Sequence, residues 1–392
     1  MSNNSFCHFV GRKIRCIFHR DTLSQKQAVY SSHRFLQDKT RIIPTFDPFP
    51  LVNVLNLSQP VANYLANPLA LITIFIAASI LMIWRLHAME SKGFEGTVLG
   101  TLIMPYCSGF ANLIFAFVMT RSGGNGRLVI ENCLVNNVTN LTLILGLAAV
   151  LCAPAIAPKV FSGRGAKKQT DVRRLFRLDL LFTLIALFLF TGTLWALAKD
   201  REIDFYDGLV LVGLFLFWQI LHVFEILKNN VRNNRTFHWS IAIDLLLIAV
   251  SAYGIYLSVD HLVTWIGNGT GGTDGGSGVF SATNLGWLSG ALMVLPNALL
   301  ALYYARAGRQ DIVVSSQIGD GHICIPMCVG LYALFDPIRI PEFFQTSIII
   351  LLGAGAVHFV SIALFGRLPR LLGFGMLAAY AFFLYTGLVG SA

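Results

Sequence analysis

Residues 131–149 read ENCLVNNVTNLTLILGLAA, a run in which polar amides interrupt an otherwise apolar segment. Asn132, Asn136 and Asn140 are four residues apart, so on a helix they share one face. Hydrocarbon offers amides no water, so these side chains must face protein or a water-filled cavity. Interhelical hydrogen bonding would account for one or two of them. A clustered stripe is more typical of an ion path, and that is what we predict.

The composition of the whole chain indicates that this stretch crosses a membrane. Of 392 residues, 55% are hydrophobic and only 12% are charged, and the mean hydropathy is +0.66. Soluble domains carry about 25% charged residues. These values exclude a soluble globular enzyme, a disordered chain and a coiled coil, and they predict a polytopic membrane protein. The net charge of +9 is then interpreted as charge in the loops and tail, with no nucleic-acid partner.

Ten charge-poor runs follow residue 67, each near the roughly 20 residues that cross a bilayer as a helix. They are too long for membrane strands and do not alternate as strands do. The predicted fold class is therefore all-α, a polytopic membrane protein of about ten transmembrane helices. The predicted spans are 68–86, 97–120, 130–156, 177–198, 206–227, 237–259, 280–305, 312–335, 343–365 and 370–390.

Basic residues concentrate in the loops after the odd-numbered spans, which predicts that these loops are cytoplasmic and that both termini face outward. Residues 1–67 form a basic, acid-poor tail without the apolar core of a secretory signal. This tail is open to three interpretations: a disordered segment, a mis-assigned start, or a transit-like or membrane-surface segment. We expect the cell (inner) membrane as the location, with an organellar membrane as the alternative.

An internal repeat links two distant parts of the chain. Asn112 and Asn297 each precede an Arg-x-Gly by nine residues, and Asn140 and Cys324 each precede a Gly-Leu by six. A chance match between two regions rich in Gly and Leu is the alternative interpretation. The matching segments are 109–147 and 294–331.

The second copy begins five spans after the first, and because that number is odd the copies must insert in opposite orientations. Inverted repeats are a recurring feature of secondary transporters, whose ion sites lie at the midplane where the copies meet. The predicted halves are 68–227 and 237–390, with repeat cores at about 97–156 and 280–335.

One acidic side chain, Asp320, lies deep in the eighth span. A carboxylate there is costly unless it is paired, hydrated, protonated or ligated, so we predict that it has a function. Pro105 and Pro296 interrupt spans 2 and 7, and they either kink the helix or free backbone carbonyls that can ligate a cation. The predicted ion-binding residues are Asn112, Asn136, Asn140, Asn297 and Asp320, supported by Asn137, Pro296, Ser108 and His322.

Motifs for catalysis or for a bound metal are missing from the sequence. It holds no HExxH, no P-loop and no GxGxxG on a strand, and its seven cysteines lack metal-site spacing. We therefore predict no enzymatic activity, no structural metal site and no cofactor; a transported cation such as Ca²⁺, Na⁺ or H⁺ is the substrate. The predicted partners are the lipid bilayer and inorganic cations, and the sequence identifies no protein partner.

The repeats resemble the alpha-repeats of the calcium/cation antiporter superfamily, which includes sodium/calcium exchangers. Residues 136–149 (NNVTNLTLILGLAA) are similar to the second helix of the family's first repeat. Residues 295–299 (LPNAL) are similar to the Pro-Glu region of its second, and 207–215 (DGLVLVGLF) to its fifth helix. The resemblance implies ten helices in two inverted halves. It also implies antiport of Ca²⁺ or another cation against Na⁺ or H⁺.

The resemblance also shows where this chain departs from the family. The two family glutamates that bind the ion correspond here to Asn112 and Asn297, and the family serines correspond to Asn136 and Asp320. Both principal carboxylates are thus absent, and one carboxylate stands at a new position. Calcium takes about 6–8 oxygens and usually several carboxylates. A site with a net charge of −1 suits Na⁺, K⁺ or H⁺ better.

Three hypotheses follow from these residues. In the leading one, a secondary cation transporter uses Asp320 to bind a cation when ionised and a proton otherwise. In the second, the exchanger fold is kept as a non-transporting membrane module for sensing, assembly or lipid interaction. In the third, the protein transports another solute, including an anion drawn to the N-termini of broken helices.

Overall fold

The structure is a computed structural model that describes residues 67–91, 104–152, 166–233, 240–269, 284–306 and 310–389. Eight of the helices in these ranges are long and apolar enough to cross a membrane, and a shorter apolar helix covers Phe205–Leu221. A helix lies within each of the ten predicted spans. The prediction of an all-α polytopic membrane protein is therefore confirmed. Apart from Asn67, the predicted N-terminal tail lies outside the described residues.

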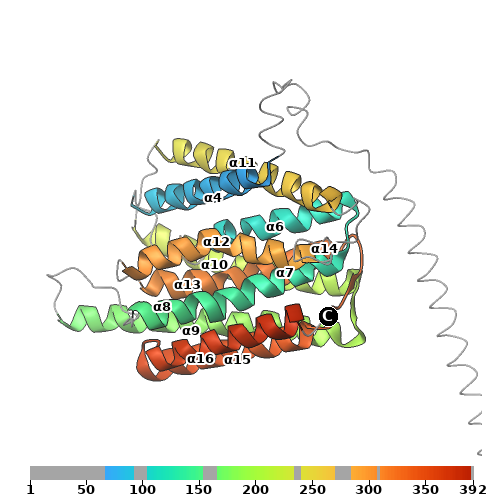
Figure 1. Cartoon of the computed structure of the whole chain (residues 1–392). Helices are drawn as coiled ribbons and strands as arrows, with labels where there is room; N and C mark the ends of the chain where they lie inside the picture. The colour runs from blue at the N-terminus through green and yellow to red at the C-terminus, as the bar shows by residue number, and fades with distance from the viewer. Residues whose placement is uncertain are drawn as a thin grey trace, which may run out of the picture. The chain divides into compact units, whose positions relative to one another are not determined.

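Sixteen helical elements follow one another in the described part of the chain, several of them continuous with the next (Figure 1). Those of the first half are α4 (Pro68–Ser91), α6 (Met104–Ser122), α7 (Gly126–Val138), the π-helix η2 (Thr139–Ile144), α8 (Leu145–Cys152), α9 (Ala166–Leu197), the 3₁₀ turn η3 (Ala198–Asp200) and α10 (Phe205–Asn233). Those of the second half are α11 (Ser240–Gly269), α12 (Leu285–Arg306), α13 (Gln310–Ile323), the π-helix η5 (Cys324–Cys328), α14 (Val329–Ala333), α15 (Phe344–Phe365), α16 (Arg370–Leu384) and the π-helix η6 (Tyr385–Val389).

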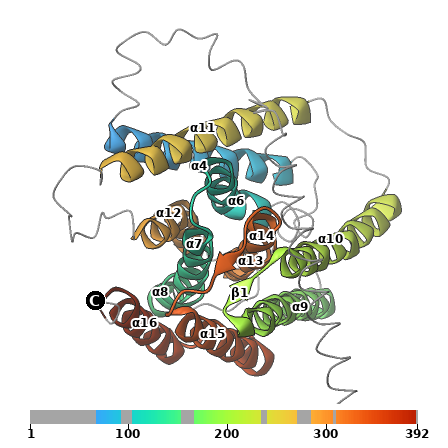
Figure 2. The ribbon, with the colours of Figure 1, turned by 90° about the vertical axis from the view of Figure 1, so that its right-hand side faces the viewer.

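The helices that carry the asparagine stripe and Asp320 lie at the centre of the bundle. In the most apolar 18-residue stretch of Gly126–Leu151, 78% of residues are buried, and in that of Ile312–Ala333, 89%; in that of Ala242–Trp265 only 28% are. Figure 2 shows α7, α12, α13 and α14 in the middle, with α4 and α11 on one side and α15 and α16 on the other. This arrangement follows from the sequence, because hydrocarbon rejects amides and carboxylates and the bundle interior accepts them.

The two halves of the bundle exchange helices across their interface. Helix α6 of the first half packs on α13 of the second, and α12 of the second packs on α7 of the first. In the same way α10 packs on α14, and α16 packs on α8. We would expect this reciprocal packing of the two predicted inverted repeats, and it brings α7 and α13 into contact.

Glycines at equivalent repeat positions allow the exchanged helices to come close. A Cβ on Gly208 of α10 would lie 2.9 Å from the carbonyl oxygen of Gly330 in α14. A Cβ on Gly373 of α16 would lie 2.8 Å from the carbonyl oxygen of Gly146 in α8. Small residues at such crossings let membrane helices pack backbone to backbone. The Gly-Leu shared by the repeats is therefore a helix-crossing position in each half.

The repeats also share an interruption of the α-helix. The π-helical segment η2 separates α7 from α8, and η5, which begins at Cys324, separates α13 from α14. In η2 the Thr139 hydroxyl donates to the carbonyl of Val135 over 2.7 Å, and in η5 Pro326 has no N–H to donate. Short π-helical segments occur frequently at functional sites, and both of these border the Asp320 region.

A two-residue β-ladder joins the loop before α10 to the loop before α15. Strand β1 (Glu202–Ile203) follows η3, and β2 (Ile338–Arg339) follows α14. The strands pair antiparallel, with Glu202 opposite Arg339 and Ile203 opposite Ile338. The ladder connects the first half of the bundle to the second at one end.

Candidate functional site

Asp320 of α13 is fully buried and accepts hydrogen bonds from both halves of the bundle. Its Oδ2 accepts from Nδ2 of Asn136 over 2.6 Å and from Nδ2 of Asn140 over 2.7 Å. Nδ2 of Asn297, on α12, donates to the same oxygen over 3.4 Å. Four of the five predicted ion-binding residues are thus in direct contact around one carboxylate.

Two features of the helices bring these side chains to one point. Asn136 and Asn140 are one turn apart, the first at the end of α7 and the second in the π-helical segment η2. Asn297 follows the buried Pro296 inside α12. Because α12 packs on both α7 and α13, Asn297 reaches the carboxylate of Asp320, which lies on the next helix of the chain.

The asparagines point their donors at the carboxylate and leave acceptors unused. The Oδ1 atoms of Asn136 and Asn140 are buried and have no hydrogen-bond partner among the described residues. A carboxylate accepts hydrogen bonds and cannot donate them, so it orients each amide with Nδ2 toward it. The cluster therefore combines one carboxylate with amide oxygens that have no protein donor, and both kinds of oxygen are hard ligands for cations.

Asn112 of α6 is the fifth predicted residue, and it is fully buried. Neither its Nδ2 nor its Oδ1 has a hydrogen-bond partner among the described residues. One turn earlier, a Cβ on Gly109 would lie 3.4 Å from Oδ1 of Asp320 and 3.1 Å from Cβ of Ile323. The absence of a side chain at Gly109 thus lets α6 approach the carboxylate, a role that the sequence prediction did not assign to this glycine.

The remaining member of the asparagine stripe, Asn132, makes a separate contact one turn away. Its Nδ2 donates to the hydroxyl of Ser289 over 2.9 Å and to Sδ of Met293 over 3.4 Å, both on α12. Nδ2 of Asn136 also lies 3.5 Å from Sγ of Cys324. Ser289 and Met293 were missed because each is unremarkable within an apolar helix.

The predicted supporting residues have different surroundings. Nδ2 of Asn137 donates to the Cys133 carbonyl of its own helix over 2.7 Å. Nε2 of His322 lies 2.9 Å from the Thr183 carbonyl, and its ring packs edge-on against Phe190 and Trp218, on the side of α9 and α10. Pro296 lies beside Asn297, as described above. For Ser108 the structure describes the helical backbone and not the side chain.

Other buried ionisable groups are held by partners outside this cluster. Asp244 of α11 forms an ion pair with Arg85 of α4, with 3.5 Å between Oδ1 and Nη1. Oε1 of Glu131 accepts from Nε of Arg127 over 2.7 Å. Among the described residues no group of three or more His, Cys, Asp or Glu could hold a metal ion. Asp320 is therefore the carboxylate around which the buried amides gather.

Comparisons with known proteins agree with this architecture. Residues 64–224 match the family model "Sodium/calcium exchanger protein". A solved structure of the sodium-calcium exchanger NCX_Mj, soaked with 2.5 mM Na⁺ and 0.1 mM Sr²⁺, is 17% identical with a TM-score of 0.56, covering 82% of this chain and 97% of that one. The same exchanger soaked with 10 mM Na⁺ and 10 mM Sr²⁺ is 16% identical with a TM-score of 0.58, covering 83% and 98%. No curated protein matches the chain.

The described helices form a multi-pass membrane protein with the fold of sodium-calcium exchanger structures, and residues 64–224 resemble the sodium/calcium exchanger family. The resemblance to this family that was predicted from the repeats is thereby confirmed for residues 64–224. The solved structures show that the fold is shared over most of the chain.

Proposed function

We propose that this chain is a secondary cation transporter whose ion site is built on Asp320. The observation that carries the proposal is the convergence of Asn136, Asn140 and Asn297, from both repeats, on one buried carboxylate. A buried charge is costly in a membrane and is rarely kept without a function. Its position where two inverted repeats meet is where secondary transporters bind their ions.

The charge of the cluster favours a monovalent cation or a proton over calcium. Asp320 contributes one negative charge, and the asparagine oxygens contribute none. Calcium takes about 6–8 oxygens and usually several carboxylates. Asn112 and Asn297, which stand where the family has glutamates, supply at most neutral oxygens, so the proposed substrate is Na⁺, K⁺ or H⁺, exchanged against another cation.

Amide rotation gives the cluster a way to change its ligands. Without a cation, Nδ2 of Asn136 and of Asn140 neutralises part of the carboxylate charge by hydrogen bonding. When a cation enters, rotating either amide by half a turn replaces the donor by Oδ1, which then ligates the ion. A proton on Asp320 competes with that cation for the same oxygens. One carboxylate thereby couples the two ions without further groups.

Flux across proteoliposomes tests this proposal. Purified full-length protein is reconstituted, and uptake of Na⁺, K⁺ and Ca²⁺ is followed with and without a proton gradient. We expect coupled monovalent flux that Asp320→Asn abolishes, because Asn keeps the size and loses the charge. Glu202→Gln, which removes an exposed carboxylate in β1, serves as the control and should retain flux. Coupled flux that survives Asp320→Asn contradicts the proposed mechanism.

A second candidate is a non-transporting membrane module with the exchanger fold. It is favoured by one observation: Oδ2 of Asp320 accepts hydrogen bonds from three amide donors, so protein groups alone offset part of its charge. Thermal unfolding in detergent separates the two candidates, since a ligand at 100 times its Kd stabilises a folded protein by about 2.7 kcal/mol. A shift with Na⁺ or K⁺ that Asp320→Asn removes supports the transporter. No shift with any cation at any pH supports the module.

A further inference from the structure

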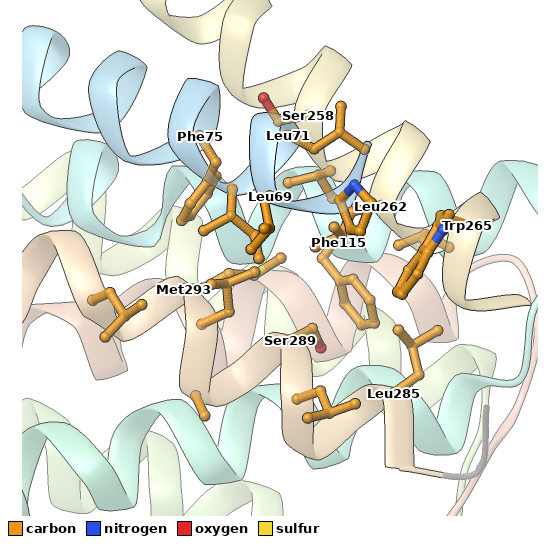
Figure 3. Close-up of a pocket in the computed structure, with 18 residues that line it drawn as sticks. Leu69, Leu71, Phe75, Phe115, Ser258, Leu262, Trp265, Leu285, Ser289 and Met293 are labelled. Atoms are coloured by element: carbon orange, nitrogen blue, oxygen red, sulfur yellow. The ribbon is translucent and has the colours of Figure 1, made fainter. Parts of the chain in front are cut away.

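A cavity of about 520 Å³ lies between the α4–α11 pair and helices α6 and α12, apart from the Asp320 cluster (Figure 3). Its size falls within the about 300–1,000 Å³ of small-molecule sites. Apolar side chains from all four helices form its wall, among them Leu69, Phe75, Phe115, Leu262, Trp265 and Met293.

The polar groups in the wall are already engaged. The Ser258 hydroxyl donates to the Gly254 carbonyl over 2.6 Å. The Ser289 hydroxyl donates to the Gly286 carbonyl over 3.1 Å and accepts from Asn132. A buried water needs about 2–4 polar partners, so this wall holds water poorly. Left empty, the cavity would deprive its lining atoms of dispersion contacts. A hydrocarbon chain needs no polar partners, and it would give the lining atoms the dispersion contacts they lack.

The surroundings of the cavity identify the source of that hydrocarbon. Its wall comes largely from α4, α11 and α12, all of which are candidate membrane spans. Three of its residues are also on the lipid-facing surface, since Leu69 is 72% exposed, Leu295 43% and Trp265 42%. The wall is thus continuous with the surface that the bilayer covers, and lipid chains surround that surface.

The cavity also lies near one end of the bundle. Pro68 begins α4, Leu285 begins α12 and Trp265 lies in the last turns of α11, and all three line it. Tryptophan is favoured at the boundary between hydrocarbon and head groups. A lipid held here could keep its head group at the membrane surface and extend one chain inward.

We propose that this cavity binds one acyl chain of a bilayer phospholipid. The head group lies beside Trp265, and the chain end contacts the buried side chains of Phe115 and Met293. This contact has a structural consequence, because Met293 also receives the hydrogen bond of Asn132 and Phe115 lies one helical turn after Asn112. The bound chain would then pack against the residues that support the buried asparagines.

Photo-crosslinking in proteoliposomes tests the proposal. The full-length protein is reconstituted in phosphatidylcholine that carries a diazirine near the end of one acyl chain, and adducts are mapped by mass spectrometry. We expect adducts on Met293 or Phe115, which are 3% and 0% exposed and out of reach of the surrounding lipid. Leu262→Trp fills the cavity and should reduce these adducts roughly tenfold, the factor that corresponds to about 1.4 kcal/mol.

Leu246→Trp is the matched control, because Leu246 is on the same helix, is 65% exposed and does not line the cavity. It should leave the adducts on Met293 and Phe115 unchanged. Gel filtration checks that each variant is folded, and Val263→Phe offers a second way to fill the cavity. Adducts confined to exposed side chains, adducts that both filling variants leave unchanged, or labelling by a diazirine sterol alone would each overturn the proposal.

Discussion

Asn136 and Asp320 occupy the same position in the two repeats, 184 residues apart, and their side chains are joined by a hydrogen bond of 2.6 Å. Two equivalent residues of an inverted repeat can touch only where the pseudo-twofold axis passes between them. We therefore predict that the axis relating the two repeats passes through the carboxylate–amide cluster, with the charge of Asp320 on one side and the neutral amide of Asn136 at the related position.

This symmetry predicts that the charge can be moved across the axis. Asp320→Asn alone should abolish coupled cation flux. Adding Asn136→Asp restores one carboxylate within a few ångströms of the original, so we expect flux to return in part. Proteoliposome uptake measures both variants. If the double variant stays inactive while it folds and retains a cation-dependent thermal shift, the position of the carboxylate matters more than its charge.

The hydrogen bond of Asn136 should contribute measurably to stability. Asn136→Ala removes a donor from the buried carboxylate, and interhelical hydrogen bonds in membranes are worth about 0.6–1.7 kcal/mol. We expect a loss of this size in the free energy of unfolding, measured by denaturation in mixed micelles. Asn137→Ala is the control, because its Nδ2 bonds to its own helix, and its loss should be smaller. Equal losses would argue against a specific contribution from the contact with Asp320.

The close crossing of α10 and α14 predicts a large effect of one methyl group. In Gly208→Ala the new Cβ would lie 2.9 Å from the Gly330 carbonyl oxygen, and overpacking of this kind costs about 1–3 kcal/mol. Gly213→Ala, in the same helix, has nothing within 4 Å of its Cβ and should cause no loss. Thermal unfolding of the two variants in one detergent measures the difference, and similar melting temperatures would contradict the predicted crossing.

Gly109 predicts an effect on ion binding through packing. In Gly109→Ala the added Cβ lies 3.1 Å from Ile323 and 3.4 Å from Oδ1 of Asp320, so α6 and the helix that carries Ile323 and Asp320 must shift apart by a few tenths of an ångström. We expect cation affinity to fall roughly tenfold, or about 1.4 kcal/mol, as read from the cation dependence of the melting temperature. Gly192→Ala, whose Cβ meets nothing within 4 Å, should leave that dependence unchanged. If Gly109→Ala leaves the cation affinity unchanged, the packing of α6 against the carboxylate does not affect ion binding.

Much of the fold could be predicted from the hydropathy of the sequence and from its internal repeat. The ten spans each contain a helix, because runs of about 20 apolar residues have few other options in a bilayer. The π-helical segments could not be predicted in the same way. Hydropathy does not distinguish a π-helical turn from an α-helical one, and only Pro326 in η5 gives a local indication of an interruption.

The sequence allowed several residues of the site to be predicted, but not how their side chains are arranged. A buried Asp and an asparagine stripe are conspicuous among apolar residues, and Asp320, Asn136 and Asn140 do come together. That Asn132 would turn to Ser289, or that His322 would face Phe190, depends on the rotation of each helix about its axis. Gly109 was predicted only to weaken its helix beside Pro105; that its missing side chain brings α6 close to Asp320 depends on the packing of two helices.

The ladder of Glu202–Ile203 with Ile338–Arg339 has a mechanical consequence. Its main-chain hydrogen bonds tie one half of the bundle to the other at a single end. Because the halves also interlock through α6 on α13 and α12 on α7, the ladder is not a hinge between them. It joins the loop before α10 to the loop before α15, so it fixes where these two helices begin relative to each other.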